Sequence, residues 1–281
     1  MITCNLMGGL GNQIFQIFAT ITYAIKSHNQ FKFTNEKTLG GGNTTVRRTY
    51  WDSFFHKLKP FTTNEFPLMN IIREKDFTFN ELPLHEMVNN NVMINGYFQS
   101  YKYFEENYEI IIRMIGLEKL KTDLLKKMNY ESNYLNNSIS MHFRIGDYKN
   151  IQHFHPIMTK EYYERCLTYI QSIDTNTKFN ILYFCEDTDL VEVLEKINYL
   201  SAKFPHYNFV RGEKNLEDWQ QMLLMSCCHH NVIPNSSFSW WAAYFNSSLD
   251  KIVCYPSIWF GPAGPNNTKD LCPPTWTEIE A

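Results

Sequence analysis

An imidazole, a guanidinium and a carboxylate follow one another in the sequence Met-His-Phe-Arg-Ile-Gly-Asp-Tyr at residues 141–148. The apolar residues 139–141 predict a buried strand, and His142, Arg144 and Asp147 come at its end. Ligands of open α/β sheets bind where strands end. The planar fork of an arginine matches a phosphate and stays charged at any working pH. The segment therefore indicates a site that stabilises a departing diphosphate. The alternative is an Arg144–Asp147 ion pair that braces a turn.

A second apolar run, at residues 232–234, leads into Asn235, Ser236, Ser237 and Phe238. We expect Asn235 or Ser236 to be the N-cap of an aromatic helix. Backbone N–H groups and serine hydroxyls at a helix start bind phosphate without a lysine. The alternative is that these residues cap the helix and bind nothing.

A third apolar run, at residues 181–184, ends in Glu186, Asp187 and Asp189. In one interpretation Asp187 and Asp189 form the D-x-D of metal-dependent sugar transferases, whose carboxylates hold a divalent cation against a diphosphate. In another, Asp187 accepts hydrogen bonds from the N–H edge of a guanine. The third interpretation is simple N-capping of a helix at residues 188–199.

A glycine loop, Gly-Gly-Leu-Gly-Asn-Gln at residues 8–13, separates a first strand at residues 2–6 from a helix with apolar residues at helical spacing. It is an incomplete dinucleotide fingerprint, because Ile14 stands where the third glycine belongs. Glycines let the backbone approach a ligand closely, and a helix start favours an anion. Gly11 and Asn12 are therefore candidate ligand contacts. The alternative is a tight turn without a ligand.

The elements that position these segments follow an α/β pattern, and we place a domain boundary near residue 136, giving domains 1–135 and 136–281. Strands and helices alternate in the second domain, which predicts a parallel sheet with helices on both faces. We expect strands at 139–143, 180–185, 207–210, 230–234 and 251–254, with helices at 159–173, 188–199, 215–227 and 238–246. Residues 38–70 look irregular. Two such domains facing each other would form a cleft for two substrates.

Composition excludes several classes of protein. The net charge of the 281 residues is only -3, which argues against nucleic acid or an anionic membrane as a partner. No apolar run approaches the roughly 20 residues that span a bilayer. Seven cysteines, an odd number, are typical of a reducing compartment. We therefore predict a soluble, unanchored cytoplasmic protein.

Several segments, in order and at similar spacing, resemble the α-1,2-fucosyltransferases and, more distantly, the α-1,6- and protein O-fucosyltransferases. They are residues 8–13, 96–104, 142–148, 217–227, 235–241 and 255–260. The resemblance implies a GT-B-like architecture of two Rossmann-like domains with parallel sheets facing across a cleft. It also implies transfer of L-fucose from GDP-β-L-fucose to the 2-hydroxyl of a galactoside, with inversion and without a metal. Animal members carry an amino-terminal membrane anchor. This sequence shows no such apolar segment, so we expect a microbial or viral form.

The resemblance implies that the carboxyl-terminal domain binds GDP-fucose and that the amino-terminal domain lies on the acceptor side. Arg144 would hold the diphosphate, and His142 and Asp187 would bind the guanine. Ser236, Ser237 and Phe238 match the phosphate-binding turn, and Asn12 lies in the loop that approaches the β-phosphate. Backbone amides near Ser236 and Gly11 would assist Arg144. Two departures from the family pattern are Ile145, where a second arginine is common, and Glu186, whose role stays open.

For the remaining chemistry, Asp147 is our candidate for the group that takes the acceptor proton, with turn bracing as the alternative. Trp51, Tyr97 and Gln99 are candidate acceptor contacts, although aromatic clusters are also typical of cores. We expect no cofactor, GDP-fucose being a substrate, and a β-galactoside-terminated glycan as acceptor. The rival functions are a metal-dependent GT-A transferase that uses Asp187 and Asp189, and a non-catalytic module that binds a nucleotide or a glycan.

Overall fold

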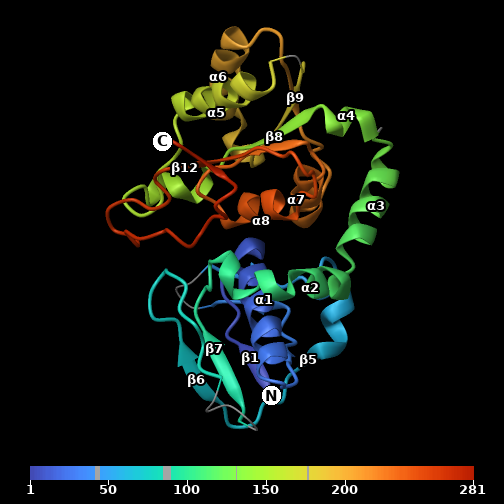
Figure 1. Cartoon of the computed structure of the whole chain (residues 1–281), viewed down its shortest axis with the longest axis vertical. Coiled ribbons are helices and arrows are strands. Elements are labelled where there is room, and N and C mark those ends of the chain that lie inside the picture. Colours follow the sequence, from blue (N-terminus) through green and yellow to red (C-terminus); the bar gives the residue numbers. More distant parts are fainter. Residues whose placement is uncertain (42–44, 85–89, 131, 176) are drawn as a thin grey trace. The chain divides into compact units, whose positions relative to one another are not determined.

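The computed structural model describes the whole chain except residues 42–44, 85–89, 131 and 176 (Figure 1). The chain forms two compact units, residues 1–120 with 267–273 and residues 121–266 with 274–281. The backbone therefore passes between the units after residues 120, 266 and 273. The first of these passages lies within helix α3 (Leu117–Met128), whereas the sequence placed a boundary after this helix, near residue 136.

The first unit is built on a three-stranded sheet in the order β1-β7-β6, and both strand pairs are parallel. Helix α1 packs on β1 and is buried over most of its length, because its apolar residues recur at helical spacing and extend around the helix. The elements of this unit are β1 (Ile2–Cys4), α1 (Leu10–Lys26), β2 (Phe33–Thr34), β3 (Thr38–Leu39), β4 (Arg47–Arg48), η1 (His56–Phe61), β5 (Thr62–Thr63), β6 (Asn70–Arg73), β7 (Val92–Asn95), η2 (Tyr101–Tyr103), η3 (Glu105–Asn107) and α2 (Tyr108–Ile115).

The second unit contains a six-stranded parallel sheet in the order β10-β9-β8-β11-β12-β13. Its elements after α3 are α4 (Ser132–Asn136), β8 (Ser138–His142), η4 (Gly146–Asn150), α5 (Lys160–Ile173), β9 (Asn180–Phe184), η5 (Asp187–Asp189), α6 (Leu190–Lys203), β10 (Asn208–Arg211), α7 (Asp218–Ser226), β11 (His230–Val232), α8 (Ser237–Phe245), β12 (Val253–Pro256) and β13 (Thr277–Ile279). The predicted alternation of strands and helices is confirmed, and so is the α/β class.

Helices α5 and α6 cover one face of this sheet, and α7 and α8 cover the other (Figure 1). The buried core on the α5 and α6 side joins apolar residues of β8 and β9 to those of the two helices. From β8 the chain adds β9 and β10 on one side, then crosses to add β11, β12 and β13 on the other. The strand order therefore reverses between β8 and β11. In open α/β sheets this switch point, at the carboxyl ends of the strands, is where ligands bind.

Helices in the described part of the chain lack the combination of length and apolar character that crossing a bilayer requires.

Candidate active site

Arg144 lies just after β8, at the switch point of the six-stranded sheet, and its side chain is 21% exposed. One terminal nitrogen of the guanidinium donates to Asp147 Oδ1 at 2.5 Å, and the other pairs with Glu186 Oε1. The guanidinium carbon also lies 5.1 Å from the centre of the Tyr148 ring. The arginine fork is thus at the sheet edge and already bound to two half-exposed carboxylates. An anion can take their place at little cost in desolvation, because both carboxylates can return to water.

The loop that carries Arg144 is held by a buried carboxylate from the end of the neighbouring strand. Asp189, at the end of η5, is 2% exposed and accepts the backbone N–H of Gly146 at 2.7 Å. Lys149 Nζ lies 3.5 Å from the same carboxylate. Gly146 has a φ of 28°, outside the usual range of residues with a side chain. Asp189 therefore fixes a turn that the glycine makes possible.

Tyr148 connects this loop to the turn that follows β11, on the other side of the switch point. Its hydroxyl donates to the backbone oxygen of Asn235 at 3.0 Å. Asn235 is 1% exposed, and its side-chain amide donates to the backbone oxygens of Pro156 at 3.1 Å and Trp259 at 3.0 Å. Desolvation raises the pKa of Tyr148 to about 12, so the hydroxyl keeps its proton. Asn235 is thus a buried anchor, and Ser236 is the N-cap.

The turn 235–238 has the features of an anion site. Ser236 caps α8, but its side chain accepts no N–H of the helix, so simple capping does not account for the hydroxyl. Ser237 and Phe238 are the first two residues of this helix, and the ring of Phe238 lies 5.5 Å from that of His142. His142, Ser236, Ser237, Phe238 and Arg144 therefore come from the ends of two strands, as the sequence predicted, and the structure shows that these strands are neighbours in one sheet.

His142 is a neutral imidazole in this environment. It is the last residue of β8 and is 8% exposed, and its Nδ1 has no hydrogen-bond partner among the described residues. Burial, with the charge of Arg144 as a second cause, lowers the pKa of His142 to about 3. A neutral ring can hydrogen-bond to a nucleobase, whereas it adds no charge to phosphate binding.

Asp187 and Asp189 have different partners, although they are only two residues apart. Asp187 is paired with Arg211, the last residue of β10, and its side chain is 79% exposed. Asp189 is buried beneath the loop of Arg144. Within the described residues no group of three or more His, Cys, Asp or Glu side chains is arranged to hold a metal ion.

In the first unit, the predicted donor residues lie at the start of α1. Gly11 and Asn12 are in its first turn, and Gly9 is the N-cap. Gly8 has a φ of 76°, and a Cβ there would meet the side chain of Asn12, so the glycine allows the amide its position. Asn12 Oδ1 accepts a hydrogen bond from Gln99 Nε2 at 2.8 Å. A predicted donor contact and a predicted acceptor contact are therefore bonded to each other.

The three candidate acceptor contacts differ in exposure. Tyr97 is 41% exposed, and Gln99 is half-buried. Trp51 is only 3% exposed and stacks on Phe33 with ring centres 5.5 Å apart. Trp51 therefore packs as part of the core of this unit, and its contact with an acceptor stays a prediction.

Some residues of the site received no role, or a different one, in the sequence analysis. Tyr148 and Arg211 were given none, and Asp189 was considered only as a metal ligand. Arg211 comes directly after the predicted strand 207–210, so the rule that led to Arg144 also applies to it. The partners of Asp189 and Tyr148 lie 43 and 87 residues away, and local spacing carries no information about them.

Residues 1–259 match the model of glycosyl transferase family 11. The chain therefore belongs to glycosyl transferase family 11, and it is a glycosyltransferase. The family resemblance and the enzyme class that the motifs predicted are confirmed.

Two similar proteins of Escherichia coli align along nearly their whole length. The O-antigen biosynthesis glycosyltransferase WbnK is 28% identical, over 99% of this chain and 100% of the relative. An α-1,2-colitosyltransferase is 27% identical, over 100% of this chain and 99% of the relative. Among solved structures, POFUT1 in complex with GDP aligns with a TM-score of 0.46 at 10% identity, over 90% of this chain and 97% of that one. A mutant of Arabidopsis thaliana FUT1 with GDP gives 0.45 at 9% identity, over 90% and 69%.

Proposed function

We propose that this glycosyltransferase transfers L-fucose from GDP-β-L-fucose to the 2-hydroxyl of a galactoside, with inversion and without a metal ion. The observation that carries the proposal is the position of Arg144 at the switch point of the six-stranded sheet. The α-1,2 linkage is also in the name of one similar bacterial enzyme. Galactoside choice and inversion rest on the family resemblance.

The largest demand of this reaction is to neutralise the charge that grows on the β-phosphate as the bond to the sugar breaks. In our proposal the diphosphate displaces Glu186 and Asp147 from the fork of Arg144. The Ser236 hydroxyl, which makes no cap, and backbone N–H groups at the start of α8 would bind further phosphate oxygens. Glu186 thereby gains a role: it keeps the arginine paired when no donor is bound.

We propose that the base of GDP is recognised by His142 and Asp187. The neutral His142 side chain lies beside Phe238 and supplies a hydrogen-bonding ring at the sheet edge. Asp187 is oriented by Arg211 and keeps a largely exposed carboxylate that can accept from a guanine N–H edge. Gly11 and Asn12 are kept as proposed donor contacts of the first unit, and Tyr97 and Gln99 as proposed acceptor contacts.

For the acceptor proton, we propose Asp147, whose carboxylate would be released from Arg144 when the donor binds. The ion pair at 2.5 Å equally suits the turn-bracing alternative. A separate measurement is therefore needed. If Asp147 takes the proton, Asp147→Asn lowers turnover without weakening GDP binding, whereas loss of a brace weakens both.

The rival that uses a metal needs Asp187 and Asp189 on one cation. Their separate partners, Arg211 for one and Gly146 with Lys149 for the other, argue against this arrangement. The test is transfer from GDP-fucose to a panel of galactosides, with and without EDTA. Full activity after chelation supports the proposal, and loss that Mg²⁺ or Mn²⁺ restores contradicts it. Calorimetric binding of GDP without any product would instead support a non-catalytic module.

A second candidate donor sugar is colitose, because one similar enzyme is named an α-1,2-colitosyltransferase. Colitose differs from fucose by the absence of the 3-hydroxyl group. Competition between GDP-fucose and GDP-colitose in one assay measures the ratio of kcat/KM values. A ratio in favour of GDP-colitose would replace the sugar in our proposal and leave the roles proposed for Arg144 and Ser236 unchanged.

A further inference from the structure

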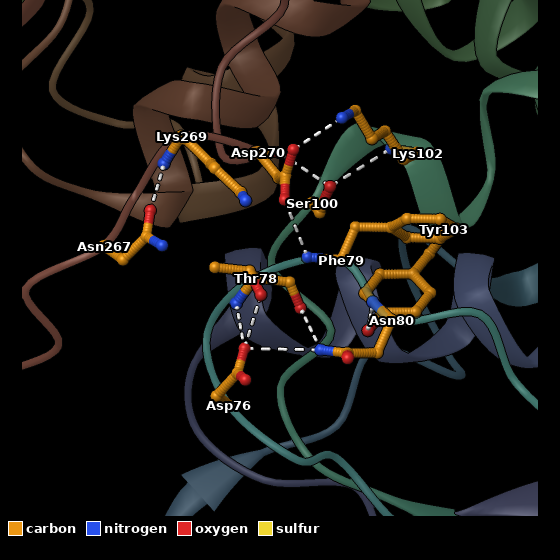
Figure 2. Close-up of polar contacts among 10 residues, drawn as sticks. All are labelled: Asp76, Thr78, Phe79, Asn80, Ser100, Lys102, Tyr103, Asn267, Lys269 and Asp270. Atoms are coloured by element: carbon orange, nitrogen blue, oxygen red, sulfur yellow. Dashed lines mark hydrogen bonds and ion pairs between the residues drawn. The ribbon is translucent and has the colours of Figure 1, made fainter.

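The segment 267–273 leaves the second unit and belongs to the first, where Asp270 is its anchor. Figure 2 shows Asp270 among residues of two other segments. Its carboxylate accepts the backbone N–H of Phe79 at 3.1 Å and pairs with Lys102 Nζ at 2.5 Å. Its backbone oxygen accepts the hydroxyl of Ser100 at 2.6 Å. One residue near the carboxyl terminus thus fastens two segments that lie 168 to 191 residues earlier in the chain.

The contact with Ser100 is buried and those with Phe79 and Lys102 are partly buried, which makes them more than a chance surface arrangement. The side chain of Asp270 is 8% exposed, and Ser100 is fully buried. A buried carboxylate is retained at low cost only when it is both paired and hydrogen-bonded, and Asp270 is both. The segment also lies beyond residues 1–259, the part of the chain that matches the family model. The loop 96–102 lies inside the matched region, but the segment that holds it lies outside that region.

The loop 96–102 begins directly after β7 and includes the start of η2, and Asp270 holds its carboxyl-terminal end. Glu74 holds its start by accepting the backbone N–H groups of Tyr97 at 2.7 Å and Phe98 at 2.9 Å. Phe98 has a φ of 51°, which is unusual for a residue with a large side chain. A strained loop keeps one conformation only when its surroundings fix it. The exposed Tyr97 and the half-buried Gln99 owe their positions to these two carboxylates.

We propose that Asp270 is a positioning residue for acceptor recognition, because it fixes the loop 96–102 that presents Tyr97 and Gln99. This inference rests on the proposed function, in which these two side chains contact the acceptor. Asp270 itself does not contact the sugar in this proposal, because its carboxylate binds Phe79 and Lys102 and its backbone oxygen binds Ser100. Loss of the anchor should therefore impair acceptor binding more than donor binding, because among the proposed donor contacts only Asn12 is bonded to this loop, through Gln99.

The test compares Asp270→Ala with Ser100→Ala, with the double variant and with the conservative Asp270→Asn. Asp76→Asn is the matched control, because Asp76 accepts from Thr78 and Asn80 in the neighbouring turn and, among the described residues, makes no hydrogen bond to the loop 96–102 (Figure 2). Each protein is assayed for the acceptor KM, for kcat and for GDP affinity by calorimetry. Hydrogen exchange of the amides of residues 97–102 reports the loop directly and requires no activity.

We expect Asp270→Ala to raise the acceptor KM about tenfold, the effect of losing a hydrogen bond to a charged group. GDP affinity should stay within about twofold of the wild-type value, a smaller change than the tenfold that corresponds to 1.4 kcal/mol. Exchange in residues 97–102 should become faster. Asp270→Asn should fall between wild type and Asp270→Ala, since its side-chain oxygen still accepts from Phe79. The double variant should be less than additive, because both changes release the same anchor.

Unchanged acceptor KM and unchanged exchange in Asp270→Ala would overturn the inference. The inference would also fail if Asp270→Ala and Asp76→Asn raised the acceptor KM and lowered kcat and GDP affinity to the same extent. Equal effects of this kind would indicate a general loss of folding. If the wild-type protein transfers no sugar to any galactoside, the proposed function has failed, and the exchange experiment still decides whether Asp270 anchors the loop.

Discussion

Two loops, one in each unit, are held in the same way and yet differ in their electrostatics. The loop 143–150 of the second unit and the loop 96–102 of the first both follow a parallel strand, and each is fixed by a carboxylate that accepts backbone N–H groups. Asp189 accepts from Gly146, and Glu74 accepts from Tyr97 and Phe98. Asp189 has a lysine 3.5 Å away. Glu74 has no cation paired with it in the part of the chain that the structure describes.

The difference shows what a cation adds to a buried carboxylate. Desolvation is the main cause that raises the pKa of Glu74 from 4.5 to about 7, and its two N–H donors offset this only in part. Lys149 gives Asp189 a compensating charge. The loop of Arg144 is therefore held by a carboxylate with a charged partner, and the loop 96–102 by one that can take up a proton near neutral pH.

The largest effect is expected at Arg144, the group that the first of these loops presents. Arg144→Ala should lower turnover on the order of 10²–10³-fold, because it removes a preorganised donor to the developing charge. Arg144→Lys should also fail, since it restores the charge without the fork. Steady-state kinetics with saturating GDP-fucose provides the measurement. A variant that keeps more than about a tenth of wild-type turnover, a loss of less than 1.4 kcal/mol, would contradict the role of this loop.

A smaller effect is expected from the carboxylate beneath that loop. Asp189→Ala leaves the buried N–H of Gly146 without its acceptor and should lower the free energy of unfolding by about 2 kcal/mol. Asp189→Asn keeps an acceptor oxygen and should cost about 1 kcal/mol. Chemical denaturation measures both values. Lys149→Met is the control for the ion pair, and its effect should be smaller than that of either Asp189 variant, because the lysine is partly exposed.

The sequence predicted the second unit well because its strands are buried and bounded by turn residues. Runs such as residues 181–184 are apolar throughout, as expected for a sheet covered on both faces. The same logic placed Arg144, His142 and Ser236 at strand ends, whereas the order of the strands, which makes these ends neighbours, came from the structure. The strand β6 was not predicted, since three of its four residues are exposed at a sheet edge and show no apolar alternation.

Contacts between distant segments were beyond the reach of sequence patterns. Trp51 and Tyr97 each stand next to another aromatic residue in the sequence, yet one is buried and the other is 41% exposed. Tertiary packing of Trp51 against Phe33 and Phe55 decides this. Asp270 lies in a tail segment without a recognisable motif, and its partners are at least 168 residues away. Segments of this kind are placed by tertiary contacts and not by local propensity.

The carboxylate without a cation predicts a pH effect on the first unit. The folded pKa of Glu74, about 7, lies above the ordinary value of 4.5, so the folded protein binds the proton more tightly than the unfolded chain. The free energy of unfolding of the wild type should therefore fall as the pH rises between these values. Glu74→Gln, which does not titrate, should lack this fall. Denaturation of both proteins across this range tests the sign, and parallel curves would contradict the assignment.

The smallest effect is expected at Tyr148. The question here is whether the Tyr148 hydroxyl or the Asp189 carboxylate is the main support of the loop 143–150. Tyr148→Phe removes the hydrogen bond to the Asn235 oxygen and keeps the ring beside Arg144. The free energy of unfolding should fall by about 1 kcal/mol, and turnover should change less than about fivefold. Tyr148→Leu removes the ring as well and should lower turnover further. If Tyr148→Phe costs more stability than Asp189→Ala, the link to Asn235, and not the buried carboxylate, is the main support of the Arg144 loop.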